Sequence, residues 1–129
     1  MITQSDLLKI TYDMCRQFNT DLYMPLTFPE EEIKSERIVI LGGVITDGSR
    51  WDRISVRINW CVPDIKGEPN GVRLEEVEKT LRNAFSRGAG MVEGCRYRWR
   101  RESTETVTER GMKVHYANLT LKYELLNTN

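Results

Sequence analysis

The stretch from Arg53 to Phe85 constrains the fold most, because it joins a strand with one buried face to an amphipathic helix. In its first part polar side chains alternate with apolar ones, which are Ile54, Val56, Ile58, Trp60 and Val62. This period of two is that of a strand packed on one side. After Pro63-Asp64 the chain crosses a loop, and apolar residues then recur at helical spacing from Leu74 onward. The stretch predicts the centre of a small α+β fold and carries no catalytic motif.

Two further elements are predicted before this stretch. Ser5 to Phe18 repeats apolar residues at helical spacing after the capping pair Thr3 and Asp6, which indicates a first helix. Arg37 to Thr46 is rich in β-branched residues, and the Asp47-Gly48 pair after it tolerates the positive φ angles of a tight hairpin turn. We therefore expect this strand to return antiparallel through the alternating one.

Proline and glycine interrupt two other segments. Pro25 and Pro29 lack the amide donor of a sheet ladder, so residues 21–32 predict at most a short edge strand followed by a loop. Ser86 to Gly94 contains Gly88, Gly90 and Gly94, which predicts the end of the second helix and a flexible connection.

The final third predicts a long β-hairpin. Cys95, Tyr97 and Trp99 alternate with arginines, and residues 102–110 are then polar apart from Val107. The apolar residues of the returning strand change phase along its length, which predicts a bulge near Ala117-Asn118. Because its outer half is polar, we expect this hairpin to extend beyond the domain that anchors it.

Together these elements predict an α+β fold in a single domain of residues 1–129. We expect an antiparallel sheet of about four to five strands, with two helices packed on one face and a long protruding C-terminal β-hairpin.

The charge total argues against two classes of partner. Nineteen basic residues balance nineteen acidic ones, so the formal net charge is +0. A nucleic-acid coat or a membrane-surface protein carries an excess of positive charge, whereas a neutral chain better suits a subunit of an assembly. The three cysteines lack CxxC spacing and indicate reduced thiols in a cytoplasm. We recognise neither a signal peptide nor a run of about 18 apolar residues that could span a membrane.

The reactive residue types form no catalytic or metal-binding pattern. His115 is the only histidine and is expected at a surface or interface, so it cannot build a multi-histidine metal site. Cys15 is expected in the core, and no activating group accompanies any cysteine. The glycine pairs do not match a phosphate loop. The sequence therefore predicts no catalytic residue, no metal and no cofactor, and the protein is not expected to be an enzyme.

Residues 96–101 interleave arginines with Tyr97 and Trp99, which leaves three interpretations open. In a strand the aromatic residues face one side and the arginines the other, so base stacking and phosphate contacts would not share a surface. We therefore favour core aromatics with arginines paired to nearby carboxylates. A subunit interface and direct contact with DNA are the alternatives.

The layout resembles that of tailed-phage tail terminator (tail completion) proteins and related neck proteins. The resemblance rests on "RISVRINWCVPDIKGEPNGVRLEEVEKTLRNAF", a central strand leading through a loop into a helix, and on the hairpin "CRYRWRRESTETVTERGMKVHYANLTLKYELL". It implies a ring-forming virion protein, commonly of six copies, at the head-tail junction. Such a ring ends tail-tube growth and docks to the connector, without enzymatic activity.

The resemblance also implies partners and a location. The partners would be sister subunits, the tail tube protein and neck or connector proteins, with DNA passing through the lumen without specific binding and with no membrane contact. The protein would be assembled in the host cytoplasm and reside in the tail or neck of the virion. A head-closure or adaptor neck protein is the main alternative, and a small nucleic-acid-binding module is a further one.

The outer part of the predicted hairpin is the segment expected to contact a neighbouring subunit, because exposed strands can add to a neighbour's sheet. The residues expected at this inter-subunit interface are Arg98, Arg100, Arg101, Glu102, Glu105, Val107, Glu109, Arg110 and Met112.

Overall fold

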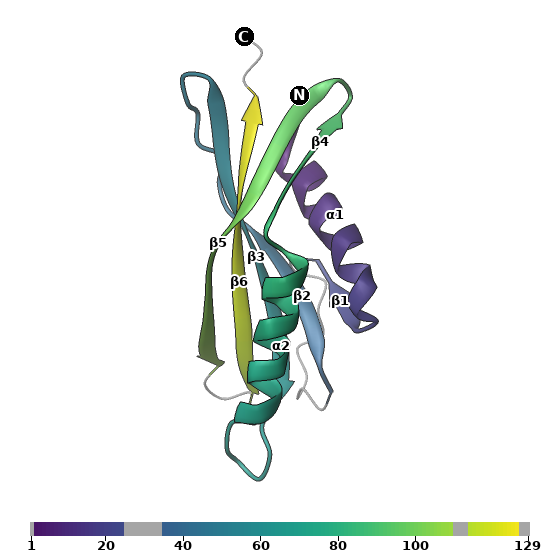
Figure 1. Ribbon diagram of the computed structural model, residues 1–129, viewed down its shortest axis with the longest axis vertical. Helices are drawn as coiled ribbons and strands as arrows, with labels where there is room; N and C mark the ends of the chain where they lie inside the picture. Colours follow the sequence, from purple (N-terminus) through teal and green to yellow (C-terminus); the bar gives the residue numbers. More distant parts are fainter. Residues whose placement is uncertain (1, 25–34, 110–113, 127–129) are drawn as a thin grey trace.

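Two α-helices and six strands make up the described part of the chain, which comprises residues 2–24, 35–109 and 114–126 of a computed structural model (Figure 1). Helix α1 spans Gln4–Cys15 and continues into a 3-10 turn, η1, at Arg16–Phe18, and helix α2 spans Gly71–Ala84. The strands are β1 (Asp21–Tyr23), β2 (Arg37–Gly42), β3 (Trp51–Pro63), β4 (Arg87–Val92), β5 (Cys95–Glu109) and β6 (Val114–Leu126). They form one mixed sheet in the order β1-β2-β3-β6-β5-β4, curved into a half-barrel. The α+β class is thereby confirmed.

The sheet differs from the expected one in strand number and direction. Where four to five antiparallel strands were expected, the described residues form six, and β1 runs parallel to β2. The other pairings are antiparallel. β1 is three residues long and lies at one edge, as expected for a strand that a proline-containing segment follows.

The additional strand is β4, in the segment expected to be a flexible connection. Its glycines lie opposite aromatic residues of β5, Gly88 opposite Trp99 and Gly90 opposite Tyr97. A Cβ at Gly88 would overlap the indole ring, and one at Gly90 would overlap the phenol ring. The glycines therefore provide the space in which these rings cover the strand, a known way of stabilising glycine in a sheet. The expectation of a flexible connection was wrong because it considered the glycines without their cross-strand neighbours.

The tight hairpin turns also lie elsewhere than expected. β2 and β3 do pair antiparallel, but β2 ends at Gly42, and a Thr46–Arg53 bridge closes a wider loop in which neither Asp47 nor Gly48 has a positive φ. Glu93 (φ 48°) and Gly94 (φ 81°) instead form the two-residue turn between β4 and β5. Two consecutive positive φ angles are what a tight hairpin requires.

Both helices cover the same face of the sheet, α1 over β2 and β3, α2 over β6 and β5 (Figure 1). The core lies between them, and the alternating residues of β3 from Ile54 to Val62 are at most 3% exposed. Burying a large apolar side chain contributes about 1.5–3 kcal/mol, so this row fixes which face of the sheet the helices cover. At the start of α1, Thr3 and Asp6 form the predicted capping box, with the Thr3 amide donating to Asp6 Oδ2 at 2.8 Å.

The register irregularity lies in β5 rather than at Ala117-Asn118. β6 keeps one phase along its length, with Ala117, Leu119, Leu121, Tyr123 and Leu125 all buried on the core face. In β5 the register shifts between Arg101 and Ser103. The bulge was predicted in this strand because all its apolar residues were expected to share one face, whereas Tyr116 lies on the outer face, away from the helices and beside Cys61.

Candidate functional site

The outer half of β5 forms an open edge of the sheet. β4 accompanies β5 as far as Arg100, and the Arg101 amide then donates to the Ser86 carbonyl at 2.9 Å. From Ser103 to Glu109, β5 pairs with β6 alone among the described residues. Figure 1 shows this part of β5 in dark green at the margin of the sheet. Such an edge presents main-chain donors and acceptors to which another strand can add.

The hydrogen-bond ladder shows which amides of this edge point outward. Gly43 N donates to Ser55 O at 3.0 Å. The main-chain N–H and C=O groups of odd-numbered residues of β3 therefore point toward β2, and those of even-numbered residues point toward β6. The registers of β3 with β6 and of β6 with β5 show that the main-chain groups of Glu105 point toward β6, where Glu105 pairs with Asn118. Thr104 and Thr106, on either side of it, therefore direct their main-chain groups to the open side. These two residues are the centre of the edge.

Four of the predicted interface residues lie on two neighbouring surfaces. Arg98 and Arg100 lie beside β4 on the outer face of the sheet, and both are exposed. Glu102 and Glu105 are exposed on the open half of β5. The open half therefore carries carboxylates, and the half beside β4 carries cations.

The remaining outer residues are described in part. Val107 and Glu109 belong to β5, where they pair with Tyr116 and Val114. Arg110 and Met112, also predicted at the interface, lie outside the described residues.

Arg101 has a role within its own chain. It pairs with Leu121 on the core side of the sheet, where its Nη1 donates to the carbonyls of Arg82 at 2.6 Å and Phe85 at 2.9 Å. These carbonyls lie at the end of α2, where the last turn of a helix leaves acceptors without internal donors. Arg101 therefore caps α2 and is committed to this contact, so we do not include it in the interface proposed below.

β5 and β6 do not project past the rest of the sheet within the described residues. β3 accompanies β6 along its whole length, from Trp51 opposite Leu126 to Pro63 opposite Val114. The uncovered part is therefore a lateral edge rather than a projecting tip. The connection at residues 110–113 lies outside the described part of the chain.

Helix α2 supports the open edge from the core side. Thr104 Oγ1 donates to Glu78 Oε1 at 3.2 Å, and Arg82 Nη1 approaches the same hydroxyl at 3.5 Å. With the Arg101 cap, these contacts hold the edge strand against the helix on both sides of its bulge.

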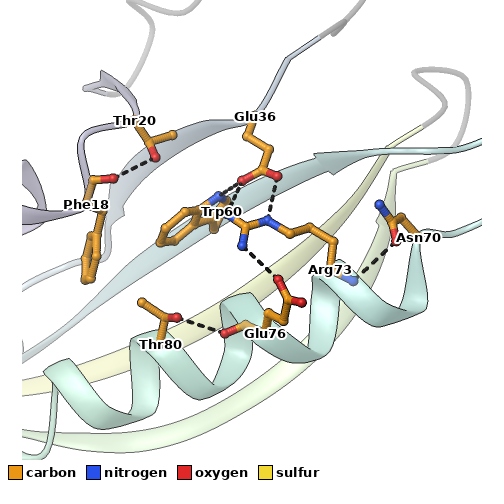
Figure 2. Close-up of polar contacts among 8 residues, drawn as sticks. All are labelled: Phe18, Thr20, Glu36, Trp60, Asn70, Arg73, Glu76 and Thr80. Carbon is orange, nitrogen blue, oxygen red and sulfur yellow. Dashed lines mark hydrogen bonds and ion pairs between the residues drawn. The ribbon is translucent and has the colours of Figure 1, made fainter.

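A second polar cluster joins α2 to the other side of the sheet (Figure 2). The Arg73 guanidinium donates to both oxygens of Glu36, through Nε at 2.7 Å and through Nη2 at 2.9 Å. Its Nη1 contacts Glu76 at 3.1 Å, and Trp60 Nε1 donates to Glu36 at 2.9 Å. Two parallel bonds between arginine and a carboxylate make a strong and geometrically specific pair.

This cluster is suited to holding the helix, not to proton transfer. The hydrogen bonds from Arg73, and then that from Trp60, lower the pKa of the Glu36 carboxyl despite its partial burial. The carboxylate in turn raises the pKa of the Arg73 guanidinium. A general acid or base working near neutrality needs the opposite shift in a carboxyl group. We therefore assign Glu36 and Arg73 a docking role for the start of α2.

His115 is paired rather than exposed at the surface. Its Nδ1 lies 2.8 Å from Asp64 Oδ1, and the two side chains are 14% and 10% exposed. A histidine oriented by a carboxylate resembles part of a catalytic triad, but no described hydroxyl or thiol is hydrogen-bonded to the ring. The pair ties β6 to the loop that leads into α2.

The buried nucleophilic groups are held in their neutral forms. Burial raises the pKa of the Cys15 thiol to about 12, so it remains protonated near neutral pH. Burial likewise raises the pKa of the Tyr123 hydroxyl, which is hydrogen-bonded to Thr11 at 2.7 Å. The expectation that Cys15 belongs to the core is confirmed. In the described residues there is no group of three or more potential metal ligands, and no helix is long and apolar enough to cross a bilayer.

Sequence reasoning missed two features of this region. The open edge could not be recognised because β4 was not expected as a strand, so its end at Arg100 could not be located. The outward residues of β3, Arg53 and Arg57, were visible in the alternation but were not related to the arginines of β5, which lie two strands away.

Comparisons with known proteins support the fold but assign no family. No protein-family model matches the sequence, and no curated protein matches it. A solved structure whose name states no function is similar to this chain, with 14% sequence identity and a TM-score of 0.58 over 100% of this chain and 99% of that chain. At this identity the similarity shows a shared fold alone.

Proposed function

We propose that the protein is a structural subunit of a tailed-phage virion, a tail terminator whose ring at the head-tail junction ends growth of the tail tube and docks to the connector. The resemblance of its strand-loop-helix unit and final strand pair to that family supports this proposal. The observation that carries it is the open edge of β5, centred on Thr104 and Thr106.

The edge suits a ring because a closed ring needs a contact between two different surfaces of each subunit. In our proposal the outer half of β5 and β6 is the hairpin that one copy offers to the next. Main-chain hydrogen bonds from Thr104 and Thr106 supply affinity, as in other cases of strand addition. Glu102, Glu105, Val107, Glu109, Arg110 and Met112 complete the proposed contact.

The contact that this edge makes between two free subunits is expected to be weak. Its described and exposed side chains, Glu102, Ser103, Glu105 and Thr106, are polar, so little apolar surface is buried when it pairs. Such a subunit would assemble when the end of a tail tube aligns several copies. The proposal includes neither catalysis nor a cofactor, and it places the protein in the virion neck after assembly in the host cytoplasm.

A matched pair of proline substitutions tests the edge. Thr106→Pro removes an amide that points to the open side, so we expect a folded protein that no longer forms the ring on tail tubes. Glu105→Pro removes an amide that bonds to β6 and should cost about 3 kcal/mol of folding stability. Thermal melts and co-sedimentation with purified tubes, with subunit number from native mass, distinguish these effects.

Two outcomes would overturn the proposal. If Thr106→Pro assembles on tubes as the wild type does, the edge is not the contact. If the wild-type protein neither binds tube ends nor is found at the neck of labelled particles, the terminator assignment is wrong.

A further inference from the structure

The outer face of the sheet gathers positive charge from four strands. Arg87 of β4, Arg100 of β5 and Lys122 of β6 lie directly opposite one another in a cross-strand row. Arg57 of β3 and Arg96 of β5 lie near this row on the same face. Like charges placed opposite one another destabilise a sheet. This arrangement therefore does not stabilise the fold, and binding of a negatively charged partner would offset the repulsion.

These cations have few counter-ions within the molecule. None of the five forms an ion pair with a described residue. Arg98 and Arg53, on the same face, share one carboxylate, Glu124, at 3.2 Å and 3.8 Å. Seven cations surround Glu124 on this part of the outer face, and Glu105 lies farther along β5 on the same face. The surface around Glu124 is therefore positive, although the formal net charge of the chain is +0. We call this surface the cationic face.

The cationic face is hollowed beside β4. A depression of about 570 Å³ is lined by Arg87, Arg98 and Arg100, together with Gly88, Ala89, Trp99 and Glu124. Ala89, the residue paired with Arg98, is small and leaves space on β4 beside that arginine. An anionic group entering it would meet guanidinium donors on two strands, and guanidinium is the side chain best matched to phosphate oxygens.

We propose that the cationic face binds the phosphate backbone of double-stranded DNA without reading its sequence. DNA presents about one negative charge per 1.7 Å of its axis, which matches a two-dimensional array of arginines better than a single anion does.

The composition of the face favours nucleic acid over an acidic protein. Protein interfaces have an apolar centre depleted in charge, whereas interfaces with DNA are polar and strongly positive. The large apolar residue beside Arg98 is Trp51, and the guanidinium covers its ring at 3.9 Å. Tyr97 and Trp99 lie on the core side, over the glycines of β4, so these two rings do not offer a platform for base stacking beside the arginines of β5. The backbone of a duplex is therefore the expected ligand, and single strands should not be preferred.

This inference deepens the proposed function, because in a ring that passes DNA the cationic face would line the channel. It rests on charge placement, however, and can be tested on the purified protein whether or not a ring forms. Loss of assembly in Thr106→Pro bears on the ring alone, and loss of DNA binding bears on the cationic face alone.

Fluorescence anisotropy with a labelled duplex of mixed sequence provides the test. If about four phosphates are neutralised, the log-log salt slope is about −3.6, so raising salt from 50 to 200 mM should weaken binding about 150-fold. The triple variant Arg57→Gln, Arg96→Gln, Arg100→Gln should reduce the slope by about 2.7. Glu124→Gln, which removes the shared carboxylate, should bind severalfold more tightly than the wild type.

The matched control removes the same charge elsewhere. Lys9, Lys66 and Lys79 are exposed on α1, on the loop before α2 and on α2. Changing all three to Gln should leave binding within about twofold, because contacts rather than net charge carry the affinity. The inference would be overturned if both triple variants lost the same affinity or if the arginine variant bound DNA as the wild type does. It would also be overturned by a tenfold preference for single strands or for one sequence. Salt-sensitive self-association with no DNA binding would instead assign the face to contact between copies, and would also overturn it.

Discussion

At the scale of single residues, the Glu36–Arg73 pair shows how a charged contact can position a helix without serving chemistry. Arg73 lies in the first turn of α2, and Glu36 lies just before β2, far away in sequence. Their bidentate contact, with Trp60 as a third member, fixes the entry of α2 onto the sheet (Figure 2). Because the pair is partly solvated, its contribution is expected to be modest.

The lowered pKa of Glu36 predicts a pH-dependent contribution to stability. A carboxyl whose pKa is lower in the folded than in the unfolded state stabilises the fold above its unfolded value, here 4.5, and this contribution is lost as the pH falls through the folded pKa. Glu36→Gln should therefore lower the free energy of unfolding by about 1 kcal/mol at pH 7 and by progressively less below pH 4.5. Urea denaturation across this range measures the difference. Glu75→Gln, which removes an exposed ion pair with Lys79, is the control and should change the free energy of unfolding little. A destabilisation by Glu36→Gln that is independent of pH would contradict the assignment.

At the scale of elements, the glycines of β4 determine where the open edge begins. Gly88 and Gly90 allow Trp99 and Tyr97 to cover β4, so that strand holds the inner half of β5 and leaves the outer half free. The edge proposed as the contact therefore depends on packing between two strands that are adjacent in sequence.

Alanine substitutions distinguish this role from a generic effect of glycine. Gly88→Ala should destabilise the protein by about 1–3 kcal/mol, because a Cβ there overlaps the Trp99 ring. Gly71→Ala, at the start of α2 where a Cβ meets nothing within 4 Å, should instead be neutral or stabilising by up to about 1 kcal/mol. Thermal unfolding of both variants checks the contrast. Equal destabilisation would mean that ring coverage of β4 does not matter.

At the scale of the whole molecule, the sequence predicted what depends on local patterns and missed what depends on neighbours distant along the chain. The alternation in β3, both helices and the Thr3 cap are local signals, and all three were predicted correctly. β4 as a strand, the bulge near Glu102 and the role of Arg101 depend on which side chain lies opposite or beneath. Such pairings cannot be read from one strand alone. For the same reason the cationic face was recognised only as a row of arginines on one strand.

The acidic side chains of the open edge have a consequence for how copies can meet. If two copies joined through identical β5 edges, their antiparallel strands would bring Glu102 and Glu105 of one copy near those of the other, and like charges opposite one another are unfavourable. Two-fold symmetric dimers, which would block growth of the ring, are therefore disfavoured. Fibrils nucleated by exposed strand edges are disfavoured for the same reason. We expect a concentrated solution of this protein to form neither gels nor precipitates. The open edge of β5 should remain unpaired until a different surface binds to it.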